Sequence, residues 1–230
     1  MDVLCWRHEQ HLYFLHIVVL VYAALPVTRA FLRRADEKTI RYALALWAFS
    51  GVLLPTARAL GLLFWLDGIP VQWALSLTWS SIGCTALGWR LRKKPLRAGT
   101  SIALVLLGFA ICYVGTAVLS IRKGTLAPQL FEGLSPGPLM MAIGIFCLCE
   151  VLAPKLPNVL QRTAETFGKA SFGIYLAHEF ALSAFRVFGV TTWFASPLIS
   201  IPALAFACLL LTFMGVFVMS KIPIVRRWLI

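Results

Sequence analysis

A histidine and a glutamate lie next to each other in an otherwise apolar stretch that is long enough to span a membrane. His178 and Glu179 close the run Ser-Phe-Gly-Ile-Tyr-Leu-Ala-His-Glu, which begins at Ser171. Ionisable groups at bilayer depth cost roughly 2.5–3.5 kcal/mol on insertion scales, so they tend to mark functional sites. On a helix, four polar side chains of this region fall within an arc of about 80°: Ser171, Tyr175, His178 and Arg186. One face of the segment is therefore predicted to be polar from end to end.

The chemistry open to this face depends on His178. A buried imidazole can act as a general base, hydrogen-bond a substrate, or pair with Glu179 or a neighbouring helix. Tyr175 and Ser171 lie one and two turns before it. Arg186 lies two turns after it, where a cation either meets an anionic substrate group or extends to lipid phosphates. The structural alternative is that these groups bond other helices and only hold the bundle together.

A second group of polar and aromatic residues opens the chain. His8, His11 and His16 lack the spacing that would place three metal ligands together on one helical face, so no metal site is predicted. Tyr13 and Phe14 fit an interfacial aromatic belt. The six cysteines likewise show no metal-ligand spacing and are interpreted as small residues of membrane helices.

The composition indicates one membrane domain over residues 1–230. Hydrophobic residues make up 60% of the 230 residues and charged residues only 13%, about half the charged fraction of a soluble domain. The net charge of +12 is explained by short basic loops that orient helices, so no nucleic-acid partner is expected. The first ten residues are polar and lack the features of a cleavable signal peptide.

Apolar runs predict an all-α, polytopic transmembrane helical bundle with about seven spans. The expected spans lie near residues 11–32, 39–55, 71–91, 98–120, 135–153, 170–190 and 197–220. Residues 56–70 are interrupted by Pro and Gly, which suggests a broken or re-entrant piece. Residues 154–169 resemble a separate amphipathic helix on the inner surface.

The basic residues predict that the N-terminus lies outside and the C-terminus inside. With this orientation, 16 of the 21 Lys and Arg residues are on the inner side. The five elsewhere are Arg7, Arg58, Arg122, Lys123 and Arg186. The basic loops around Arg33, Arg34 and Arg92 either serve this topology and meet anionic lipids, or bind a phosphate-rich donor such as coenzyme A.

These residues carry a family resemblance. The block from Ser171 to His178 resembles the Ser-x-Gly-Ile-Tyr-Leu-x-His signature near the C-terminal end of the acyltransferase 3 family. Those proteins are integral membrane acyltransferases that modify surface glycans. Residues 10–15, Gln-His-Leu-Tyr-Phe-Leu, are similar to the family's His-Leu-Trp-Phe-Leu segment, with Tyr13 where Trp is usual. Residues 71–91 resemble an aromatic-rich span of the same family.

The resemblance implies a reaction and a set of roles. An acyl group, most often acetyl, would pass from cytoplasmic acyl-CoA to a hydroxyl of a cell-surface glycan or lipid-linked sugar. The implied catalytic residues are His178, His11 and Tyr175. The implied substrate-binding residues are Ser171, Glu179, Arg186 and Tyr13. The arginines Arg33, Arg34 and Arg92 would bind the phosphates of acetyl-CoA. The expected setting is the inner membrane of a bacterium.

Members of this family usually have ten membrane helices, and the first carries an Arg and a His regarded as catalytic. Neither that helix nor the next two is found here, so the chain is expected to begin at the family's fourth helix. A complementing N-terminal membrane segment is then a possible partner. A ten-helix protein that starts inside and is cut after helix three leaves seven helices that start outside, in agreement with the charge count.

Three alternatives remain open. The chain could be a non-catalytic partner subunit or a remnant of a larger protein. A seven-helix receptor shares the topology, whereas a retinal pump is disfavoured because residues 197–220 contain no lysine. A small-solute transporter should show inverted repeats and ionisable groups in several spans, and here such groups are concentrated in one.

Overall fold

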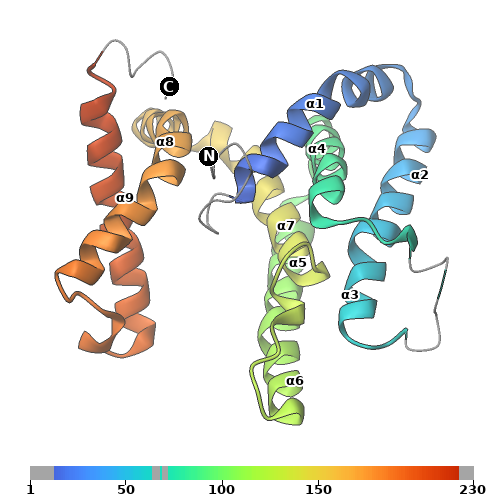
Figure 1. The fold of residues 1–230 in the computed structure, drawn as a ribbon. Helices are drawn as coiled ribbons and strands as arrows, with labels where there is room; N and C mark the ends of the chain where they lie inside the picture. The colour runs from blue at the N-terminus through green and yellow to red at the C-terminus, as the bar shows by residue number, and fades with distance from the viewer. Residues whose placement is uncertain (1–12, 64–67, 69–71, 223–230) are drawn as a thin grey trace, which may run out of the picture. The chain divides into compact units, whose positions relative to one another are not determined.

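The computed structural model describes residues 13–63, 68 and 72–222, and every regular element among them is helical. This confirms the predicted all-α fold. The α-helices are α1 (Tyr13–Arg34), α2 (Glu37–Ala48), α3 (Leu54–Ala59), α4 (Leu77–Lys93), α5 (Ala98–Ala110), α6 (Thr116–Lys123), α7 (Pro136–Leu152), α8 (Asn158–Val187) and α9 (Pro197–Met219) (Figure 1). Two π-helical turns, Phe49–Leu53 and Ile111–Gly115, join α2 to α3 and α5 to α6.

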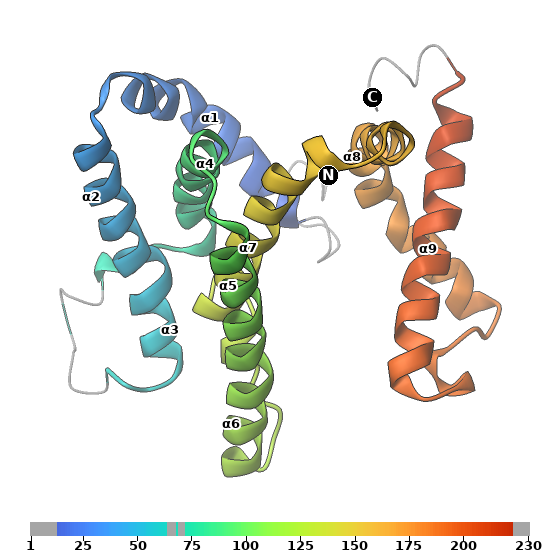
Figure 2. The same ribbon diagram turned by 180° about the vertical axis from the view of Figure 1, so that it is seen from behind.

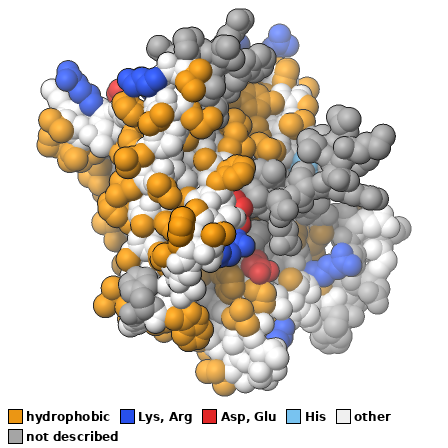
Figure 3. All heavy atoms as spheres, turned by 60° about the vertical axis from the view of Figure 1, so that its left-hand side comes forward, with side chains coloured by type: hydrophobic (Ala, Val, Ile, Leu, Met, Phe, Trp, Pro, Cys, Tyr) orange, Lys and Arg blue, Asp and Glu red, His pale blue; other side chains and the backbone are white. Residues whose placement is uncertain are grey.

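Five of the described helical segments are long and apolar enough to cross a membrane: Tyr13–Arg34, Glu37–Ala59, Ala98–Lys123, Pro136–Lys155 and Pro197–Met219. Helices α4 and α8 overlap the other two predicted spans, so the count of seven stays a prediction. Hydrophobic side chains cover much of the face drawn in Figure 3, as expected for helices that meet lipid.

One detail of the prediction needs correction, and another is described only in part. The expected boundary between a surface helix over 154–169 and a span over 170–190 is wrong, because α8 runs unbroken from Asn158 to Val187. No proline interrupts it, and Gly168 and Gly173 cost only about 1 kcal/mol each relative to alanine. Residues 56–59 of the ambiguous piece continue the helix that begins at Glu37, whereas residues 64–67 and 69–71 lie outside the described part of the chain.

The described helices form two compact units, residues 13–155 and residues 156–222, and each is considered by itself. In the larger unit, α5 packs along α7, and α1 and α2 pack against α4 (Figures 1 and 2). Glycines allow the close approach of α5 and α7. A Cβ on Gly108 would lie 2.6 Å from the Gly137 carbonyl oxygen, and one on Gly144 would lie 2.5 Å from that of Ser101. Small residues are the usual means of close helix packing in lipid.

Helix α2 is tied to α4 around a proline. Pro55 has no N–H to donate to the preceding turn, which here is π-helical. The carbonyl of Ser50 accepts the Leu75 N–H at 2.9 Å, and that of Gly51 accepts the Ser80 hydroxyl at 3.3 Å. In addition, the indole Nε1–H of Trp47 donates to the Ser80 carbonyl at 2.8 Å. Polar groups of α2, of the π-helical turn, of α4 and of the loop before α4 thus join these elements.

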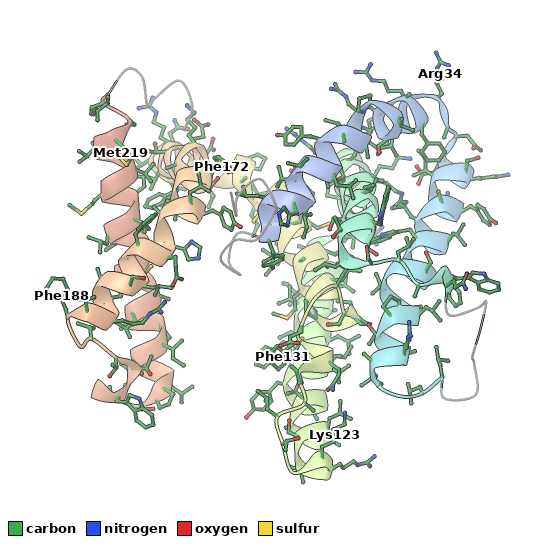
Figure 4. All side chains as sticks on the ribbon, viewed as in Figure 1. Arg34, Lys123, Phe131, Phe172, Phe188 and Met219 are labelled. Carbon is green, nitrogen blue, oxygen red and sulfur yellow. The ribbon has the colours of Figure 1, made fainter. Side chains whose placement is uncertain are left out.

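In the smaller unit, α8 and α9 lie side by side and antiparallel, joined by a turn in which Gly189 has a φ of 71°. In Figure 4, Phe188 and Met219 mark opposite ends of this pair. The contact face of α9 repeats every four residues through Cys208, Thr212 and Val216, all buried. Opposite it, a Cβ on Gly173 would lie 2.8 Å from Val216 Cγ1, so this glycine sets the separation of the two helices.

The substitution Gly83→Ala should destabilise the larger unit. Its Cβ would overlap the Trp47 ring, whose position is fixed by the bond to Ser80. Overpacking of this kind costs about 1–3 kcal/mol, which thermal unfolding of the purified protein in detergent would measure. Gly88→Ala in the same helix is the matched control, because nothing lies within 4 Å of the added Cβ. Equal melting temperatures for the two variants would contradict this account.

The predicted orientation can be tested with two lysines at opposite ends of the larger unit. Lys94 follows α4, at the end where Arg34 lies, and Lys123 closes α6 at the other end (Figure 4). In intact cells a membrane-impermeant maleimide should label Lys123→Cys, and should label Lys94→Cys only after permeabilisation. The wild-type chain, labelled in parallel, measures the signal from the native cysteines. The reverse labelling pattern would overturn the orientation.

Candidate functional site

The polar face of α8 lies away from its contact with α9. The buried positions Ala170, Gly173 and Ala181 mark the contact face. On a helical wheel the centre of the polar face lies roughly 140° from that contact face. Tyr175 and His178 are half-buried on it, and Ser171 at its start is exposed and donates its hydroxyl hydrogen to the Gly168 carbonyl at 2.7 Å.

His178 and Tyr175 are brought together by one helical turn. The Nδ1 atom of His178 lies 2.5 Å from the carbonyl oxygen of Tyr175, and the two ring centroids are 5.8 Å apart. A carbonyl oxygen can only accept, so Nδ1 must carry the proton in this hydrogen bond. In the neutral ring the basic nitrogen is then Nε2. The carbonyl of His178 in turn lies 3.7 Å from the Cys208 thiol of α9, which anchors this turn of the helix.

Glu179 and Arg186 form an ion pair across two turns of α8. The Glu179 side chain is 29% exposed and that of Arg186 is 68% exposed. The position of Arg186 in the sequence predicts a substrate anion or a lipid phosphate as its partner, and the structure adds a third partner within the same helix. A bound anion would have to compete with the Glu179 carboxylate for this guanidinium group.

The candidates near the start of the chain are described only in part. Tyr13 is the first residue of α1 and is 54% exposed. His8 and His11 lie outside the described residues. Among the residues that the structure does describe, no group of three or more His, Cys, Asp or Glu side chains could hold a metal ion.

The arginines proposed for the donor belong to the larger unit, whereas His178 belongs to the smaller one. Arg33 and Arg34 close α1 and Arg92 lies in the last turn of α4, all three exposed. The ion pair of Arg90 with Glu37, at 2.7 Å, joins the end of α4 to the start of α2 and gathers these cations at one end of the unit. Beside them, Arg33 lines an open depression of about 430 Å³ on α1.

Sequence reasoning missed a pocket at the opposite end of this unit. It has a volume of about 350 Å³ and lies between the Pro55 turn, the loop around Leu75 and residues 129–135. Its polar lining includes the acceptors of Gln129 and Glu132 beside Thr56 and Ser135, and the buried Gln129 Oε1 has no hydrogen-bond partner among the described residues. Two acceptor groups in one pocket suit a ligand that donates hydrogen bonds, such as a hydroxyl compound. In the sequence, the one indication of this pocket is Glu132, the isolated acid of the loop.

A family model described as an acyltransferase domain, that of the acyltransferase 3 family, matches residues 5–220. The match covers nearly the whole chain and includes both the first span and the polar face of α8. The chain belongs to the acyltransferase 3 family. As a member of this family it is classified as an acyltransferase, and its apolar helices make it an integral membrane protein. Comparison with curated proteins and with solved structures gives no match.

Membership of the acyltransferase 3 family indicates an acyl donor as substrate. In this acyltransferase the basic end of the larger unit offers cations for such a donor. Besides Glu37, which pairs with Arg90, a second acid moderates that charge. Asp36 caps α2 by accepting the Thr39 N–H at 3.1 Å, and hydrogen bonding from Thr39 lowers the pKa of the Asp36 carboxyl below its ordinary value.

The cap predicts a dependence of stability on pH. Because folding lowers the pKa of Asp36, the ionised carboxylate stabilises the folded state at pH values above the ordinary carboxyl pKa. That stabilisation is lost as the pH falls through the lowered pKa. Asp36→Asn keeps a capping side chain that does not titrate. Between pH 5 and pH 3 the melting temperature of the wild-type acyltransferase should therefore fall further than that of the variant. If the melting temperatures of the wild type and the variant fell in parallel with pH, Asp36 would not contribute to the pH dependence of stability.

Proposed function

We propose that this acyltransferase moves an acetyl group from acetyl-CoA to a hydroxyl of a cell-surface glycan or a lipid-linked sugar, in the inner membrane of a bacterium. The observation that carries the proposal is the hydrogen bond between His178 and the Tyr175 carbonyl, since it leaves Nε2 as the basic nitrogen. An imidazole in this state is suited to take a proton from an acceptor hydroxyl near neutral pH.

The proposed reaction has one acyl transfer and two proton transfers. His178 Nε2 takes the hydroxyl proton as the acceptor oxygen attacks the thioester carbonyl. A new ester C–O bond forms, the C–S bond breaks, and the thiolate of coenzyme A leaves. The imidazolium then returns its proton to that thiolate, so the histidine is regenerated. Tyr175 acts as a positioning residue through its backbone carbonyl, and His11 is a second candidate base.

The remaining candidates are proposed to bind the two substrates. Arg33, Arg34 and Arg92 would hold the phosphates of the donor, since guanidinium groups match phosphate geometry and stay charged. On the acceptor side the proposed contacts are Ser171, Glu179, Arg186 and Tyr13. In the predicted orientation the three arginines face the cytoplasm, where acetyl-CoA is made.

Replacing the base should remove activity without removing the protein. We expect His178→Gln, which keeps a hydrogen-bonding group but cannot act as a base, to lower acetyl release from radiolabelled acetyl-CoA by about 10²–10⁴-fold. The assay uses membranes with matched amounts of folded chain, with and without a co-expressed segment that carries three N-terminal helices of a family member. Tyr175→Phe is the matched control, because it keeps the backbone carbonyl, and it should lose less than about tenfold.

Two outcomes would reject the role of His178. Undiminished acetyl release by the glutamine variant would mean that another group, such as His11, is the base. Equal loss of activity and of membrane expression would mean that the histidine only supports the fold.

A further inference from the structure

An apolar groove runs between α1, α2 and α4 in the larger unit. Its volume is about 360 Å³. Phe31 of α1, Ala43 and Trp47 of α2, and Trp79 and Ala86 of α4 line it. Because α1 and the helical run that begins with α2 are both candidate membrane spans, we expect hydrocarbon around this groove.

The groove is held open by the same contacts that join α2 to α4. Its Trp47 wall is fixed by the indole N–H bond to the Ser80 carbonyl at 2.8 Å. Gly83 lies beneath that indole, and any larger residue there would push the ring away. The N–H of Leu75, a further lining residue, is bonded to the Ser50 carbonyl at 2.9 Å. A cavity with fixed apolar walls in contact with lipid will be filled by a hydrocarbon chain.

The basic residues next to the groove determine which lipid headgroup is preferred. The lining residue Leu32 directly precedes Arg33 and Arg34, and Ile40 directly precedes Arg41, so the groove reaches the basic end of the unit. From Ile40 to Trp47 the helix rises roughly 10 Å, the length of part of one acyl chain. Transfer of a chain from bulk lipid into the groove gains little free energy, because both surroundings are apolar. Preference among lipids therefore depends on the cations.

We propose that this groove holds one acyl chain of an anionic phospholipid whose phosphate lies among the basic side chains at the junction of α1 and α2. A bilayer lipid reaches the groove from the side, through the hydrocarbon that surrounds it. The occupant is thus a component of the membrane and not the acyl donor. Occupancy does not depend on acetyl transfer, although the lipid phosphate would share Arg33 and Arg34 with the donor of the proposed function.

The test counts lipids retained by the purified chain in native mass spectrometry. Phosphatidylglycerol and phosphatidylcholine with identical acyl chains are the probes. Two basic side chains near a phosphate should favour the anionic lipid by roughly tenfold or more. Ala43→Phe would fill the groove and should abolish retention. Ala45→Phe is the matched control, since Ala45 is exposed on the same helix and does not line the groove.

A second pair of variants keeps the test decisive if Ala43→Phe fails to fold. Arg33→Gln with Arg34→Gln should remove the preference for phosphatidylglycerol while one lipid of either kind is still retained. Arg122→Gln with Lys123→Gln removes the same charge at the opposite end and should leave the preference intact. The measurement is made without acyl-CoA, so that no donor competes for the arginines. Equal retention of the two lipids by the wild-type chain, or equal effects of the two charge pairs, would overturn the proposal.

Discussion

Pro55 and the π-helical turn before it interrupt the regular backbone hydrogen bonding of the helical run Glu37–Ala59, and the larger unit is organised around two carbonyls of that turn. In hydrocarbon an unsatisfied carbonyl costs several kcal/mol, so each must find a donor from outside its own helix. The Leu75 N–H bonds the Ser50 carbonyl and the Ser80 hydroxyl bonds that of Gly51. These bonds fix the loop before α4 and the first turns of α4 against the π-helical turn.

Two cavities of different character follow from this one junction. On the side of the basic end lies the apolar groove, with Trp47 and Trp79 as walls. On the other side lies the polar pocket, with Pro55 and Gln129 in its lining. Leu75 lines both. The contacts that satisfy the π-helical turn therefore also separate a site suited to hydrocarbon from a site suited to hydroxyl groups, within a single set of helices.

The sequence predicted the helices well and their contacts poorly, for physical reasons. Apolar runs must be helical in lipid, so each predicted span overlaps a helix. The unbroken course of α8 was missed because a change from polar to apolar composition looks like a boundary, although the backbone continues through Lys169 and Ala170. The spacing of seven residues between Glu179 and Arg186 does not by itself predict an ion pair. The bond from Trp47 to Ser80 joins residues 33 apart and depends on the packing of α2 against α4, which no local pattern encodes.

The continuity of α8 changes how the depth of His178 is understood. Counted from Asn158 the histidine lies roughly 30 Å along the helix, and only about 14 Å from its end at Val187. α8 is not among the five helical segments that meet the criteria of length and hydropathy for a span, so the depth of His178 still rests on the predicted span over residues 170–190. In that predicted span a charged group is costly, and the tautomer with its Nδ1–H bonded to the Tyr175 carbonyl is an uncharged form of the ring. That form is also the one that can accept a proton from a hydroxyl group. For the general base proposed for this acyltransferase, one hydrogen bond thus satisfies Nδ1 and leaves Nε2 as the nitrogen that takes the proton.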